Sequence, residues 1–183
     1  MKKRFFLFLI LCYLCVSLIP PVFSLTQVQV DLADYYNLDG FSYDSNRRDG
    51  DYDYQGYTYA AELINTNPTF EDVAYTLGPM TNSAKNSVAA LGQTINLPQG
   101  EYSSLRFLSS ATNADKTGTF RINYSDNTYS DTILTIRDWC YEPDGHLVVQ
   151  TMAHRHYLTG DRRETNRIFA YYLTPAKGKT VTG

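Results

Sequence analysis

Acidic residues recur at close spacing between residues 44 and 53 of the sequence. Three aspartates alternate with other residues in Asp49-Gly50-Asp51-Tyr52-Asp53, and Asp44 and Asn46 stand just before them. Calcium takes about six to eight oxygen ligands, which carboxylates and carbonyls of a loop can provide. The five residues Asp44, Asn46, Asp49, Asp51 and Asp53 are therefore our candidates for a structural Ca²⁺ site. The alternative is a solvated loop in which Arg47 and Arg48 neutralise the carboxylates, with Asp and Asn favouring turns.

Two histidines stand one residue apart in His154-Arg155-His156. On a strand they share one face, and imidazole nitrogens at that spacing can bind a transition metal. Metalloenzymes of the cupin type use such a pair with a later carboxylate and a further histidine. Asp161 could serve as the carboxylate, but no histidine follows His156, and His146 lies upstream. The other interpretation is that both histidines are hydrogen-bonded residues at the end of a strand.

Tyrosine is abundant, with 16 residues in the chain and seven between Tyr35 and Tyr59. Aromatic rings stack on sugar faces, and Arg and His donate hydrogen bonds to sugar hydroxyls. Our candidates for glycan contact are Tyr57, Trp139, Arg155 and His156. For Trp139 the alternative is a packing anchor in the core, because large aromatic side chains are usually well buried.

Motifs of nucleophilic and phosphate chemistry are absent from the sequence, which has no G-x-S-x-G elbow and no phosphate-binding loop. A pair of carboxylates for glycoside hydrolysis is defined by its separation in space and has no sequence signature. We therefore name no catalytic residue. Cys140 is expected to behave as a small buried apolar residue, since no neighbouring group is identified that would activate it.

Short alternating runs predict an all-β fold. Phe120, Ile122 and Tyr124 alternate with polar residues, and similar extended runs recur between turn signals. The runs cover residues 27–34, 57–63, 72–77, 87–90, 94–97, 105–108, 128–139, 147–153, 168–173 and 180–182. Seven or more strands with frequent turns favour a β-sandwich, of jelly-roll or galactose-binding-like type.

The N-terminus has the pattern of a signal peptide. Lys2, Lys3 and Arg4 precede an apolar run of about 15 residues, which is shorter than the roughly 20 of a membrane helix. Cleavage after Ser24 would leave one domain, residues 25–183, with a net charge of −6 instead of −3. We therefore expect a secreted protein that binds neither nucleic acid nor membrane. Because residues 180–182 resemble the start of another strand, we also expect the chain to be the first part of a longer protein.

Several stretches together resemble a known family, an accessory β-sandwich domain of secreted microbial proteins that is often found beside glycoside hydrolase modules. The stretches are residues 43–46, 49–53, 56–62, 84–88, 92–95, 117–120, 138–140 and 178–181. The resemblance runs from about Val30 to Val181. It implies a non-catalytic module with a galactose-binding-like or jelly-roll sandwich.

The expected function is a secreted, non-catalytic module that binds a glycan or polysaccharide, with a catalytic domain in the same longer chain as a candidate partner. Two alternatives stay open. One is a structural or adhesive surface module without saccharide binding. The other is a small cupin-like, metal-dependent enzyme that uses His154 and His156.

Overall fold

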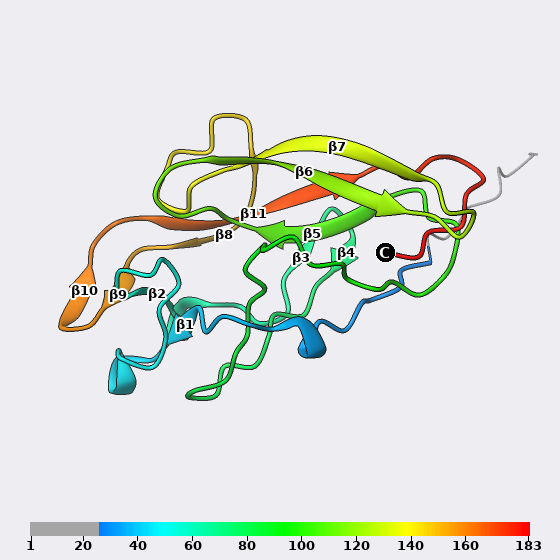
Figure 1. The fold of residues 1–183 in the computed structure, drawn as a ribbon. Helices are drawn as coiled ribbons and strands as arrows, with labels where there is room; N and C mark the ends of the chain where they lie inside the picture. The colour runs from blue at the N-terminus through cyan, green and yellow to red at the C-terminus, as the bar shows by residue number, and fades with distance from the viewer. Residues whose placement is uncertain (1–25) are drawn as a thin grey trace, which may run out of the picture.

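Two β-layers face each other in the computed structural model, which describes residues 26–183 (Figure 1). One layer is an antiparallel sheet with the strand order β5-β11-β8. Its strands are β5 (Leu105–Ser109), β11 (Asn166–Leu173) and β8 (Leu147–Met152). The other layer is the hairpin of β6 (Lys116–Asn123) and β7 (Tyr129–Ile136), which lies above the sheet in Figure 1.

Side-chain alternation along the hairpin builds the core between these layers. Phe120 and Ile122 on β6 point inward, whereas Arg121 between them is exposed. The ring of Phe120 stacks on Phe107 of β5 at 5.4 Å between centroids, and Phe107 stacks in turn on Tyr171 of β11 at 5.7 Å. The hairpin therefore covers one face of the sheet with its apolar side and exposes its polar side.

A second, mixed sheet lies at one end of the molecule, with the order β1-β2-β9-β10 (Figure 1). Its strands are β1 (Phe41–Ser42), β2 (Tyr57–Ala60), β9 (Arg155–Tyr157) and β10 (Gly160–Arg162). β1 and β2 are parallel, and the other pairs are antiparallel. The remaining elements are the strand pair β3 (Thr69–Phe70) and β4 (Val73–Ala74) and the 3₁₀ turns η1 (Ala33–Tyr35), η2 (Asp44–Asn46) and η3 (Ala61–Leu63).

Trp139 joins the two parts of the fold. It is 1% exposed and contacts the rings of Tyr52 and Tyr59, at 5.0 and 4.8 Å between centroids. Phe41 and Ile168 belong to the same buried cluster, so residues from both sheets share one core. The interpretation of Trp139 as a packing anchor is confirmed.

The all-β prediction is confirmed, and the described residues 26–183 contain no α-helix. Residues 27–34 were expected to form a strand, and this is wrong: the segment has no strand partner, and it ends in η1. Residues 87–90 and 94–97 are also outside the named strands, and Ser87 makes only an isolated bridge to Leu38. The predicted signal peptide lies outside the described residues. No helix within 26–183 is long and apolar enough to cross a membrane.

The C-terminal residues are part of the core. Val181 is fully buried and forms isolated bridges to both Gly100 and Tyr124. The backbone N–H of Thr182 donates to the carbonyl of Asn123 at 2.9 Å. This segment therefore closes one end of the sandwich instead of starting a further sheet.

Candidate metal centre

Strand register places the two neighbouring histidines next to carboxylates from other elements. His156 lies on β9, and its register partners are Thr58 on β2 and Asp161 on β10. His154 precedes β9, and its ring lies 5.6 Å from that of His156, at 27°. Two short 3₁₀ turns follow the neighbouring strands: η2 begins at Asp44 and η3 contains Glu62. The expectation that both imidazoles share one face is therefore confirmed.

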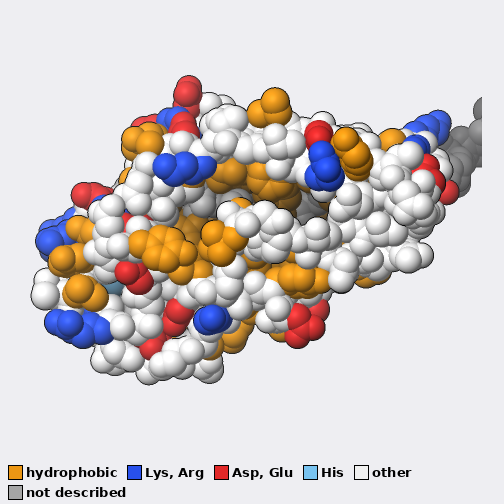
Figure 2. Space-filling view, in the orientation of Figure 1, with side chains coloured by type: hydrophobic (Ala, Val, Ile, Leu, Met, Phe, Trp, Pro, Cys, Tyr) orange, Lys and Arg blue, Asp and Glu red, His pale blue; other side chains and the backbone are white. Residues whose placement is uncertain are grey.

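The side chains converge on His156. Its Nε2 atom lies 2.8 Å from Glu62 Oε1, 3.1 Å from Asp44 Oδ1 and 3.8 Å from Asp161 Oδ1. His154 Nε2 lies 3.8 Å from Glu62 Oε1 and 3.9 Å from Asp161 Oδ2. These five residues, Asp44, Glu62, His154, His156 and Asp161, are called the histidine–carboxylate cluster below. In Figure 2, acidic and basic side chains lie together at the left end of the molecule, where the mixed sheet is, with a small area of histidine between them.

The far side of the His156 ring is fixed by buried hydroxyls. Its Nδ1 atom is 3.1 Å from the Oγ of Ser42, which in turn bonds to the Oγ1 of Thr58. All three residues are buried, and His156 is 0% exposed. A carboxylate only accepts, so the 2.8 Å hydrogen bond to Glu62 places a proton on Nε2, which a metal ion would replace. Because a hydroxyl can either donate or accept, Ser42 can then support the tautomer in which Nδ1 carries the proton. A second partner of this kind is typical of histidines that bind metals.

His154 has an unsatisfied ring nitrogen. Its Nε2 atom is buried and makes no hydrogen bond, although two carboxylate oxygens lie within 4 Å. A buried polar atom without a partner costs roughly 1–3 kcal/mol. A cation between this nitrogen and the carboxylates would remove that cost.

The charges of the cluster are unbalanced. Arg47 donates from Nη2 to Asp44 Oδ1 and from Nη1 to Asp161 Oδ1. Burial opposes the ionisation of Asp161, but the hydrogen bond and the positive charge of Arg47 keep the pKa of this carboxyl below its usual value. Three carboxylates and one guanidinium leave two negative charges when both imidazoles are neutral. A divalent cation has the charge that would balance them.

The donor atoms form two overlapping groups that could hold a metal ion, and both contain His156. One is Glu62, His154 and His156; the other is Asp44, His156 and Asp161. Within each group the donor atoms lie within 4.8 Å of one another. Ligands of a tetrahedral zinc lie roughly 3.4 Å apart, since each bond is about 2.0–2.1 Å long. The cluster is therefore close to the dimensions of a metal site. Two imidazoles and carboxylates favour zinc or a similar transition metal over calcium.

The predicted glycan contacts do not form one exposed surface. The ring of Tyr57 contacts Tyr157 at 4.6 Å between centroids, and the guanidinium carbon of Arg155 lies 4.0 Å from its centre. Arg155 also lies 5.0 Å from the ring centre of Trp139. His156 faces the histidine–carboxylate cluster instead. Because Trp139 and His156 are buried, neither presents its ring at the surface to a glycan.

The predicted calcium ligands are also dispersed. Asp49 accepts from the backbone N–H of Ser83 at 2.7 Å, and Asp51 accepts from that of Gly56 at 2.9 Å. Asp53 accepts from the N–H groups of Gln55 and Tyr57, and burial raises its pKa. Asp44 belongs to the histidine–carboxylate cluster, and Asn46 lies in η2, where its N–H donates to the Tyr43 carbonyl. Calcium binding stays a prediction, which a calcium-dependent rise in the melting temperature of EDTA-treated protein would support.

Sequence reasoning did not assign Glu62 to the cluster, nor Arg47 to a position beside it. Glu62 follows β2, and it reaches the histidines because β2 pairs with β9. These two strands are far apart in the sequence. The only local signal for Arg47 was its position among aspartates, where neutralisation of their charge was one of the interpretations. Asp161, which was considered as a carboxylate ligand for the His154–His156 pair, does lie beside them.

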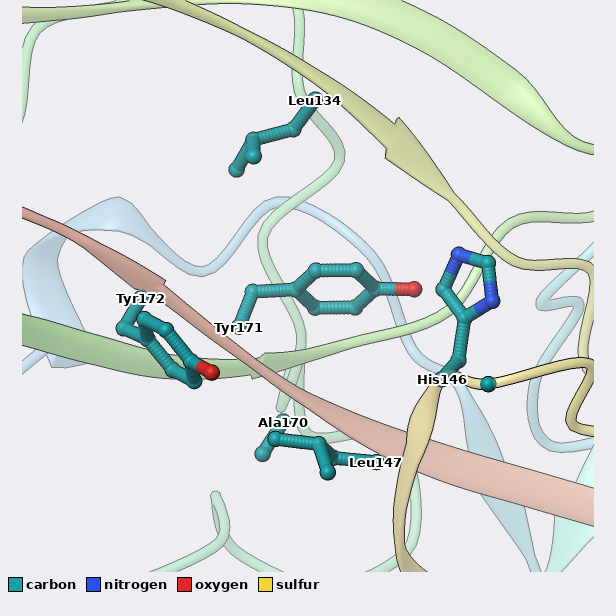
Figure 3. Close-up of a pocket in the computed structure, with 7 residues that line it drawn as sticks. Leu134, His146, Leu147, Ala170, Tyr171 and Tyr172 are labelled. Carbon is teal, nitrogen blue, oxygen red and sulfur yellow. The ribbon is translucent and has the colours of Figure 1, made fainter.

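The third histidine lines a separate hollow of about 190 Å³ between the hairpin and the sheet (Figure 3). His146 faces two backbone carbonyls, with Nδ1 3.0 Å from Pro143 O and Nε2 3.3 Å from Thr135 O. The ring of Tyr171 lies between Leu134 and Ala170 in Figure 3, and its hydroxyl accepts from the Arg137 N–H. The polar atoms of His146 and Tyr171 thus already face backbone groups. His146 is no part of the cluster.

Comparison with known proteins identifies the family. Residues 26–182 match the model of the AziU2-like beta-sandwich domain. The match covers nearly all of the described residues, so the chain belongs to this family, and the β-sandwich is confirmed. No curated protein matches the sequence.

Proposed function

We propose that this AziU2-like β-sandwich domain is a metal-binding module that holds one divalent transition-metal ion at its histidine–carboxylate cluster. Glu62, His154 and His156 are the ligands. The observation that carries the proposal is the buried, unpartnered Nε2 of His154, which faces two carboxylate oxygens within 4 Å. The two negative charges that remain when both imidazoles are neutral support it as well.

Three protein ligands leave at least one coordination position of a tetrahedral metal open. The surrounding carboxylates are partly exposed, with 39% of the Asp161 side chain and 65% of the Asp44 side chain accessible. An exogenous oxygen ligand can therefore reach the ion from the solvent side. The proposed role is metal-dependent binding of such a ligand.

Zinc titration of the EDTA-treated domain by calorimetry tests the proposal. We expect one zinc per chain, and we expect H154N and E62Q each to weaken binding at least tenfold. Replacement of His154 is preferred to that of His156, which is fully buried and bonded to Ser42. The matched control is H146N, which removes a histidine outside the cluster and should leave the affinity unchanged. An absence of zinc binding, or an equal loss in H146N, would contradict the proposal.

Carbohydrate binding is our second proposal, for a secreted module associated with a glycoside hydrolase. The exposed tyrosines of the acidic segment support it: Tyr54 is 72% and Tyr43 36% exposed. These two rings are exposed enough to stack on a sugar, whereas that of Trp139 is not. Titration with oligosaccharides should then show binding that Y54A weakens. Y172A, which removes another exposed tyrosine ring on β11, should leave that binding unchanged. Binding that neither substitution alters would rule out Tyr54 as the stacking residue.

A further inference from the structure

Arg47 lies directly on the carboxylates of the proposed metal site. It is the residue that follows η2, and only 20% of its side chain is exposed. Its guanidinium bonds to Asp44 and Asp161 at once, through two different nitrogens. Arg47 therefore connects η2 to β10 across the cluster.

The oxygens that accept from Arg47 are the same ones that face His156. Asp44 Oδ1 lies 3.1 Å and Asp161 Oδ1 3.8 Å from His156 Nε2. Asp44, His156 and Asp161 make up the second of the two possible ligand groups. A metal ion in this group would share both carboxylates with the positive charge of Arg47, and like charges at such short range repel strongly.

We propose that Arg47 is a built-in competitor of the metal ion. It neutralises Asp44 and Asp161 when the site is empty, it directs the ion to Glu62, His154 and His156, and it lowers the affinity of the site. This inference rests on the proposed function. It assigns Arg47 as the residue that sets metal affinity, although Arg47 itself has no atom that can bind a metal.

Two arginine variants with the same change in net charge test the inference. Arg47→Gln removes the guanidinium from the cluster, whereas Arg48→Gln removes a neighbouring, exposed guanidinium. By calorimetry in the same buffer, R47Q should bind zinc at least tenfold more tightly than the wild type, and R48Q should stay within about threefold of it. In EDTA, R47Q should melt at a lower temperature, because Asp44 and Asp161 then lie close together without a counter-ion. Zinc should therefore raise the melting temperature of R47Q more than that of the wild type.

Unchanged or weaker zinc binding in R47Q, with normal binding by the wild type, would overturn this inference and leave the proposed function intact. An absence of zinc binding by the wild type, R47Q and R48Q would overturn both. If R47Q does not fold, Arg47→Lys replaces it. An ammonium keeps the charge but lacks the planar fork that reaches two carboxylates. R47K should therefore bind zinc more tightly than the wild type by severalfold, and an equal or lower affinity would contradict the inference.

Discussion

Arg155 and His156 are consecutive residues that face opposite sides of the same sheet. Arg155 lies over the rings of Tyr57 and Trp139, whereas His156 points to Glu62 in the histidine–carboxylate cluster. This follows from the alternation of side chains along β9. One short strand thus contributes to the core on one side and to the candidate metal centre on the other.

Stability and metal binding should therefore respond to different residues of this segment. R155Q removes a cation that contacts two aromatic rings, which should lower the free energy of unfolding by about 1–2 kcal/mol. Zinc affinity should not change, because Arg155 lies outside the cluster. H154N should have the opposite pattern. Urea denaturation in EDTA and zinc titration of both variants check this, and a large loss of zinc affinity in R155Q would contradict it.

Trp139 should be the most costly aromatic residue to remove. Truncation of a buried tryptophan to alanine costs about 3–5 kcal/mol, and Trp139 packs on Tyr52 and Tyr59 in the core. W139A should lose this amount of unfolding free energy in urea, whereas Y172A, at an exposed position of β11, should lose less than about 0.5 kcal/mol.

Trp139 is also the only tryptophan, so its fluorescence reports on one site. We expect a blue-shifted emission maximum and weak quenching by acrylamide, as for a buried indole. Addition of oligosaccharides should leave the spectrum unchanged. Strong acrylamide quenching of the folded protein would contradict the buried position.

Cys140 should react slowly with thiol reagents. Burial raises the pKa of its thiol to about 11, whereas a free cysteine has a pKa of about 8.5. At pH 8 the thiolate fraction of folded Cys140 is then more than about a hundredfold lower than that of a free cysteine. The more basic thiolate is also more nucleophilic, which offsets roughly tenfold of this loss in reaction rate. Labelling at pH 8 should therefore be at least about tenfold slower than that of the urea-unfolded chain. Equal rates would show that Cys140 is accessible and ionised.

Replacement by alanine should lower the stability of the protein at one glycine, Gly78, and hardly change it at another, Gly118. A Cβ atom at Gly78 would lie 2.4 Å from the backbone oxygen of Asn86, whereas a Cβ at Gly118 meets nothing within 4 Å. The side chain of Asn86 holds the loop near Asp39, accepting from Gly40 N–H and donating to Asp39. G78A should cost more than about 2 kcal/mol of unfolding free energy, and G118A should stay within about 0.5 kcal/mol of the wild type. Thermal melts of both variants measure this directly.

The sequence predicted the fold best where alternation and packing agree. Phe120 and Ile122 alternate with polar residues, and they occupy the inner face of a long hairpin. Residues 27–34 alternate as well, yet no strand pairs with them, because a periodic pattern does not specify a partner. Burial of Trp139 was one of two predicted outcomes, and the pairing of distant segments decided it.

The candidate metal centre could be predicted only in part. His154 and His156 share a face for a local reason, which the sequence reveals directly. Glu62 and Asp44 reach them through the β2–β9 and β1–β2 pairings, whose register depends on the assembled core. The acidic segment was therefore interpreted as a calcium loop of its own, although Asp44 faces the histidines and Asp49 holds the backbone of Ser83.

The strand order β5-β11-β8 has a consequence for the synthesis of the protein. β11 lies between the two other strands of its sheet, and it follows both of them in the chain. While a ribosome has not yet delivered residues 166–173, β5 and β8 have no partner in this sheet, and their edges stay open to other chains. Folding of this sheet is therefore expected to wait until residues 166–173 have been synthesised, and a chaperone that shields β5 and β8 until then would raise the yield of folded protein.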